Sequence, residues 1–142
     1  MSQENVELVR SLMPAPGVDL ARIVRDEDSW EVAASADRLT TDFECVQNVF
    51  GTPKTYAGPD GLRAMLTDWL APWTTYRVEV DDAIDCGEQV VLLGRVFGRR
   101  GDSTEEVSGE MADVWTVRDG KIARWEALPS RQDALKAVGL EE

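Results

Sequence analysis

The chain has 142 residues, of which 43% are hydrophobic and 30% charged, a composition that excludes a disordered or collagen-like protein. Fifteen Lys and Arg against 27 Asp and Glu give a net charge of −12, a field that disfavours nucleic acid and anionic membranes as partners. Histidine is absent, which excludes Ser-His-Asp and Cys-His catalysis and histidine metal sites.

Targeting and cysteine signals are also sparse. No apolar run approaches the ~18 residues of a membrane span, and the first residues lack the basic and apolar regions of a signal peptide. Cys45 and Cys86 form no CxxC motif, so we expect two reduced thiols and no metal site. These observations predict one domain over residues 1–142 of a cytoplasmic protein.

The first half of the chain predicts mainly helices. Ser2 is a suitable N-cap for a first helix, which the Pro and Gly residues at 14–17 end. A short second helix is expected around 20–24, a third after Ser29, and a first strand over 43–46. A turn-rich segment then leads to Pro59, which suits the first position of a helix over 59–70.

The second half predicts a meander of strands. Alternation of apolar and polar residues indicates a half-buried strand over 76–80, with Tyr76 on its apolar side. Longer strands are expected over 89–97, 107–117 and 121–128, the last two joined by an Asp119-Gly120 hairpin turn. Ser130 then caps a final helix. The fold class is therefore α+β, with helices first and a long, twisted antiparallel sheet after them.

Two isolated opposite charges stand on apolar strand faces. Asp113 shares its face with Met111 and Trp115, and Arg95 shares the alternating set 91–97 with apolar residues. An unpaired buried charge is costly, so we expect each to have a partner or access to solvent. Three arrangements are open: a buried Arg95–Asp113 salt bridge, a polar pair lining a pocket, or, after a one-residue slip, an outward pair of Arg95 with Glu110.

A candidate pocket emerges from these residues. Asn48, Arg95 and Asp113 are its polar groups, and few polar groups within apolar walls are typical of small-ligand sites. The same large apolar residues are equally compatible with an ordinary filled core. The expected walls are Trp69, Trp73, Phe97, Met111, Trp115 and Trp125.

The chain resembles the nuclear-transport-factor-2-like superfamily, and within it the SnoaL-like proteins. The resemblance lies in residues 2–7 (SQENVE), 56–62 (YAGPDGL) and 114–122 (VWTVRDGKI), and it extends over nearly the whole chain. It implies a cystatin-like cone in which a curved, mostly antiparallel sheet packs on N-terminal helices and leaves one pocket. Because this fold hosts unrelated activities, it implies little about the reaction.

Enzymes of that superfamily suggest roles for individual residues. By resemblance to ketosteroid isomerases, Asp113 matches an aspartic acid that donates to an oxyanion, while Asn48 stands near their base. By resemblance to limonene epoxide hydrolases, Asn48 and Arg95 are kept, but Phe97 and Ala127 replace both carboxylates. SnoaL-type polyketide cyclases use one late-strand aspartate as acid and base, and Asp113 is the matching residue.

Three functions therefore remain open. The first is a cofactor-independent isomerase, cyclase or hydrolase of a hydrophobic small molecule, with Asp113 as acid and base, Arg95 as modulator and Asn48 as hydrogen-bonding group. The second is a non-catalytic binder that uses the same cavity. The third is a dimerisation module with a filled cavity. A homodimer through the outer sheet face, around Val96 and Val114, is expected with any of them.

Overall fold

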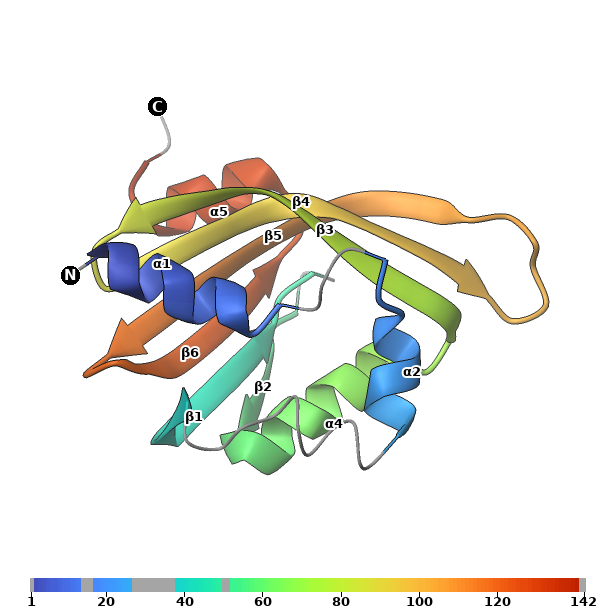
Figure 1. Cartoon of the computed structure of the whole chain (residues 1–142), viewed down its shortest axis with the longest axis horizontal. Helices are drawn as coiled ribbons and strands as arrows, with labels where there is room; N and C mark the ends of the chain where they lie inside the picture. Colours follow the sequence, from blue (N-terminus) through green and yellow to red (C-terminus); the bar gives the residue numbers. More distant parts are fainter. Residues whose placement is uncertain (1, 14–16, 27–37, 50–51, 141–142) are drawn as a thin grey trace.

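A computed structural model describes residues 2–13, 17–26, 38–49 and 52–140, which form one sheet with helices on both sides (Figure 1). The third predicted helix, after Ser29, lies outside the described residues. The described helices are α1 (Ser2–Ser11), α2 (Leu20–Arg25), α4 (Gly58–Leu70) and α5 (Arg131–Ala137). The strands are β1 (Leu39–Gln47), β2 (Lys54–Ala57), β3 (Trp73–Cys86), β4 (Gln89–Arg100), β5 (Val107–Arg118) and β6 (Lys121–Leu128).

The six strands form a curved, open sheet in the order β2-β1-β6-β5-β4-β3. Strands β3 to β6 follow one another as an antiparallel meander, while β1 pairs with β6 in parallel and with β2 in an antiparallel hairpin. The α+β prediction with a mostly antiparallel sheet is therefore confirmed.

Helices cover the two faces of the sheet unequally. α1, α2 and α4 lie on the concave face, and α5 packs alone on the opposite face of β4, β5 and β6 (Figure 1). The larger core cluster lies on the concave side and includes Val9, Phe43 and Met65, whereas a smaller cluster under α5 includes Leu93 and Ala134. The candidate pocket must therefore lie on the concave side, where large side chains from strands and helices meet.

The sequence analysis missed one strand, β2, and predicted another, β3, too short. β2 was not expected, because its four residues lie in a Gly- and Pro-rich segment and are held by pairing with β1. β3 continues to Cys86 through the acidic residues 81–85, since a register shift between Val80 and Asp82 lets this part pair with β4 as well. Pairing with a neighbouring strand overrides weak local preference.

The close approach of β3 and β4 depends on Gly94. This glycine is paired with Val80, directly at the register shift of β3. A Cβ atom at this position would overlap the backbone carbonyl oxygen of Glu79. Only glycine therefore allows the two backbones to approach so closely at the register shift.

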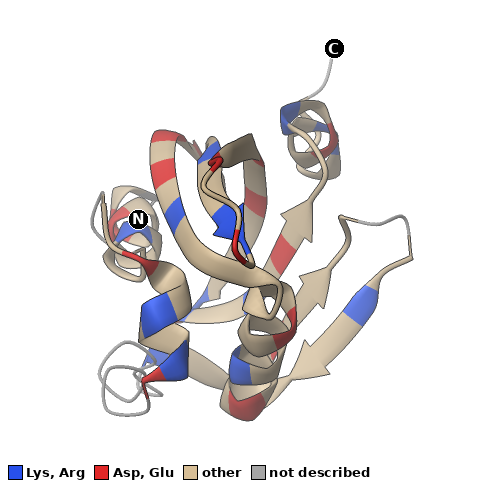
Figure 2. Ribbon diagram, turned by 90° about the vertical axis from the view of Figure 1, so that its right-hand side faces the viewer, with Lys and Arg blue, Asp and Glu red and all other residues tan. Residues whose placement is uncertain are grey.

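Charged residues of both signs are interspersed over the helices and strands on the side drawn in Figure 2. The excess of acidic residues is thus spread over the molecule instead of being gathered in one cluster on this side. None of the described helices is both long and apolar enough to cross a lipid bilayer.

We predict that Gly94→Ala destabilises the protein by about 2–4 kcal/mol, because the added methyl group must displace the backbone of β3. Gly109→Ala is the matched control, since a Cβ there meets only Val96 Cγ2 at 3.7 Å, an ordinary contact. Urea denaturation followed by circular dichroism measures both. Equal stability of the two variants would contradict the role given to Gly94.

Candidate functional site

A cavity of about 400 Å³ lies between the concave face of the sheet and the helices. Apolar side chains form most of its wall, with Leu62 and Met65 of α4 facing Phe43 and Val78 of the strands. This volume is in the range of small-molecule sites, so the large apolar side chains leave room for a ligand.

Asp113 lies in the wall of this cavity. It sits in the middle of β5, where it pairs with Ala127 of β6 and Leu92 of β4, both small or apolar neighbours. The residue is 6% exposed and is the one buried charged or polar residue among the described residues. No Lys or Arg of the described part of the chain forms an ion pair with it.

Burial controls the protonation of Asp113. Loss of water around the carboxyl group raises its pKa from 3.8 to about 7, and the nearby N–H of Trp125 opposes this shift. Among the described residues that N–H has no acceptor at hydrogen-bonding geometry, so it acts on the carboxyl group as a nearby dipole. A carboxyl group with a pKa near neutrality can both give and accept a proton under ordinary conditions.

Of the three arrangements that the sequence left open, the buried Arg95–Asp113 salt bridge and the shared pocket pair are wrong. Arg95 pairs with Glu110 across the β4–β5 ladder, and its side chain is 60% exposed and reaches Asp81 of β3 at 3.8 Å. This is the outward arrangement, one residue out of register from a shared face with Asp113. Both alternating sets of residues 90–93 are buried, under the helices on one side and α5 on the other, so apolar patterning could not distinguish the two faces.

Asn48 also points away from the cavity. Its side-chain amide donates to Glu126 Oε2 at 3.0 Å, next to the ion pairs that Arg124 makes with Glu44 and Glu126 on the outer face. Its neighbour Gln47 lines the cavity instead, and the buried oxygen Oε1 of Gln47 has no hydrogen-bond partner among the described residues. The amide next to the site therefore comes from residue 47, one residue from the predicted position.

Four of the six predicted wall residues line the cavity: Trp69, Met111, Trp115 and Trp125. The rings of Trp115 and Trp125 are stacked with centroids 5.0 Å apart, in a row next to Asp113 on the same sheet face. Contact of these residues with a ligand stays a prediction.

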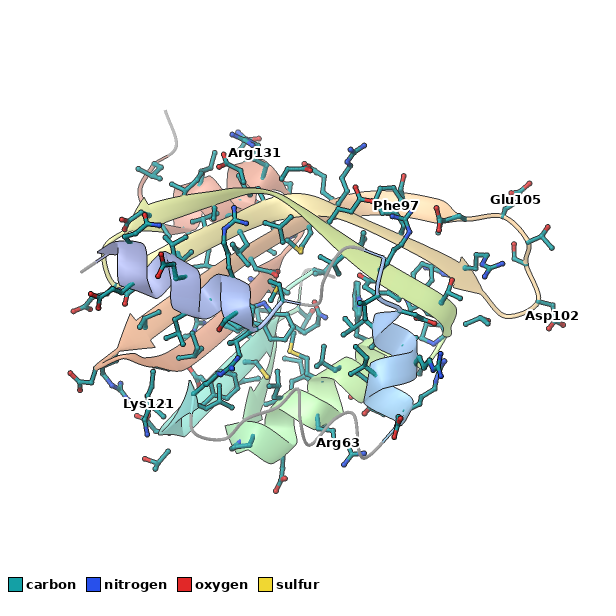
Figure 3. All side chains as sticks on the ribbon, viewed as in Figure 1. Arg63, Phe97, Asp102, Glu105, Lys121 and Arg131 are labelled. Atoms are coloured by element: carbon teal, nitrogen blue, oxygen red, sulfur yellow. The ribbon has the colours of Figure 1, made fainter. Side chains whose placement is uncertain are left out.

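Trp73 and Phe97 do not line the cavity. Trp73, the first residue of β3, covers Gly98 of β4, and its ring centroid lies 5.4 Å from that of Tyr76. Phe97 lies on the outer side of the sheet, away from α2 and α4 (Figure 3), where the Arg77 guanidinium stacks 4.1 Å from its ring centre. Phe97 and Arg95 lie on the same outer face of β4. One wrong assignment of that face therefore explains why both were predicted in the cavity.

The residues named for a dimer interface are occupied within the chain. Val96 lines the cavity, and Val114 is 2% exposed because α5 covers it. The homodimer itself stays a prediction, but these two side chains are not available to form it. Among the described residues, no three metal-binding side chains gather in one place.

Tyr76 is a cavity residue that the sequence analysis assigned only to a buried strand face. Its hydroxyl oxygen accepts a hydrogen bond of 2.9 Å from Trp69 Nε1. Burial raises its pKa to about 12, and the negative charge of Asp113 adds to that shift. The alternation along 76–80 carried the signal that this side chain faces inward, but a chain with two tyrosines offers no pattern that marks it as functional.

Comparisons with known proteins agree with this architecture. Residues 12–125 match the model of the SnoaL-like domain family. A structure described as a SnoaL-like polyketide cyclase from Jannaschia sp. CCS1 has a TM-score of 0.67 at 18% identity, covering 89% of this chain and 85% of that one. A protein of unknown function from Burkholderia pseudomallei, of the nuclear-transport-factor-2-like fold, reaches 0.65 at 18% identity, covering 96% and 98%.

TerC, crystallised with polyporic acid, has a TM-score of 0.65 at 19% identity and covers 95% of this chain and 98% of its own. At these identities the solved structures support the fold alone. No curated protein matches the chain.

We predict that Asp113→Asn stabilises the protein at pH 8 by a few kcal/mol, with the difference vanishing below pH 4. Burial makes the folded state bind this proton more tightly, so wild-type stability falls as the pH rises from 3.8 to about 7. Urea denaturation at pH 4, 6 and 8 measures the trend. Asp82→Asn removes an exposed carboxyl group and is the control; an equal trend in both variants would contradict the assignment.

Proposed function

The chain belongs to the SnoaL-like domain family, and we propose that it binds a hydrophobic small molecule in the cavity and catalyses a proton transfer on it. The observation that carries this proposal is Asp113, a buried carboxyl group in the wall of an apolar cavity that forms no ion pair within the described part of the chain. Burying such a group destabilises the folded protein, so its place beside open space favours a role in chemistry over a role in stability.

The arrangement supports acid–base chemistry with a single group. As a carboxylate, Asp113 takes a proton from a carbon atom next to a carbonyl group of the ligand; as a carboxylic acid, it returns that proton to another carbon atom. The product is an isomer of the substrate, and no oxidant, reductant or second reactant is consumed. The pKa of about 7 suits both steps at neutral pH.

A carrier that binds the same kind of molecule without changing it is the second candidate. The observation that favours it is the absence, among the described residues, of a second buried acid or base that could share the work with Asp113. The TerC structure, which was crystallised with polyporic acid, supports an organic ligand in a fold of this kind.

We predict that the protein accelerates exchange of the protons next to the carbonyl group in a panel of aromatic ketones dissolved in D₂O. The rate constant should rise with pH through a midpoint near 7, because the carboxylate of Asp113 is the base. Asp113→Asn should lower it about 10²–10⁴-fold, as expected for removal of a general base. Proton NMR measures the exchange.

The outcomes separate the two candidates. If Asp113→Asn abolishes exchange but binds the same ketones with unchanged affinity, the catalytic proposal stands. If the wild type binds ketones and exchange occurs only at the buffer rate, the protein is a carrier. Asp82→Asn, on the exposed part of β3, provides the matched control for loss of one acidic group.

A further inference from the structure

Tyr76 is held rigidly in the wall of the same cavity. The residue is 4% exposed, and its ring packs edge-on against Trp69 and Trp73, with centroids 6.4 Å and 5.4 Å away. The backbone N–H of Tyr76 donates to Asp19 Oδ1 at 3.0 Å, and the same oxygen caps α2 by accepting from the N–H of Ala21. Ring packing and this backbone bond fix where the hydroxyl group stands.

The hydrogen bonding of this hydroxyl group is incomplete. A tyrosine hydroxyl donates one hydrogen bond and accepts up to two. Here its oxygen accepts from Trp69 Nε1 at 2.9 Å, but no acceptor among the described residues receives its proton. Asp113 is not that acceptor, because it affects Tyr76 through its charge alone. A buried donor without an acceptor is costly, so an open cavity beside it is a place where a ligand can supply the missing oxygen.

The contact with Trp69 also makes this hydroxyl group a better donor. An N–H that donates to the phenol oxygen polarises the O–H bond, and chains of hydrogen bonds strengthen one another in a medium of low dielectric constant. Because burial raises the pKa of Tyr76 to about 12, the proton stays on the oxygen at neutral pH.

We propose that the Tyr76 hydroxyl group donates a hydrogen bond to an oxygen acceptor of the ligand, and that the cavity therefore selects hydrophobic carbonyl compounds over hydrocarbons of the same shape. This inference rests on the proposed function, since it requires that the cavity holds a small molecule. It assigns Tyr76 as the group that identifies the ligand and orients its carbonyl oxygen.

The position of Asp113 gives this contact a chemical consequence. Both side chains line one cavity and the charge of Asp113 acts on Tyr76, so a ligand whose carbonyl oxygen contacts Tyr76 can bring a carbon atom next to that carbonyl group to Asp113. When Asp113 removes a proton from such a carbon atom, negative charge develops on the carbonyl oxygen. A fixed O–H donor stabilises that charge more than it stabilises the neutral ketone.

The test compares 2-acetylnaphthalene with 2-isopropenylnaphthalene, which has nearly the same shape but a methylene group in place of the carbonyl oxygen. Their affinities are measured by displacement of the fluorophore 1-aminoanthracene from the cavity. We predict that the wild type prefers the ketone about fivefold, the value of one ordinary hydrogen bond. Tyr76→Phe should reduce this ratio to about one while leaving the affinity for the hydrocarbon within twofold.

The other tyrosine supplies the matched control. Tyr56 donates its hydroxyl group to Asp68 on an exposed part of α4, outside the cavity wall. Tyr56→Phe should therefore keep the fivefold preference. A second variant, Trp69→Phe, removes the N–H that polarises the hydroxyl group and should give an intermediate ratio.

Each result has one meaning for the inference. Equal affinity of the wild type for the ketone and the hydrocarbon overturns it while cavity binding stands. A preference that persists in Tyr76→Phe overturns it as well. If the wild type binds neither compound nor the fluorophore, the cavity does not hold ligands and the proposed function fails with it. If Tyr76→Phe does not fold, Trp69→Phe decides the question, because a fivefold preference left unchanged in that variant overturns the inference.

Discussion

The site depends on one buried carboxyl group, that of Asp113, which forms no ion pair with any described residue. Asp113 stands in the middle of β5, between β4 and β6, and is 6% exposed. Burial disfavours its charged form and raises its pKa to about 7. A cavity lies beside this group, and the proposed proton transfer gives a reason for the stability that its burial costs.

The curvature of the sheet keeps that cavity open. Gly94 allows β3 and β4 to approach closely at the register shift, and the sheet as a whole curves around the helices on its concave face (Figure 1). As a result Tyr76, near one edge of the sheet, and Asp113, in its interior, line a common space although they are far apart in the chain. A flat sheet of the same sequence would hold these residues apart.

The pairing register between β4 and β5 decides which polar residues belong to the site. Leu92, and not Leu93, lies opposite Asp113, so Arg95 and Phe97 face outward and the guanidinium group of Arg95 does not reach Asp113. A shift of one residue would have brought a guanidinium group to the carboxyl group and lowered its pKa. The parallel pairing of β1 with β6 similarly turns Gln47 inward and Asn48 outward.

Local patterns in the sequence were sufficient for the α+β class, for most of the described helices and strands though not for β2, and for the shared inward face of Asp113, Trp115 and Trp125, which carries the largest apolar side chains of β5 and β6. They were insufficient for Arg95, Asn48 and Phe97. α5 covers the outer face of β4, so both of its alternating sets are apolar, and no local signal tells which one faces the cavity. The tertiary structure decided that point by the register of the hairpin and by the packing of α5, both of which depend on residues distant in the chain.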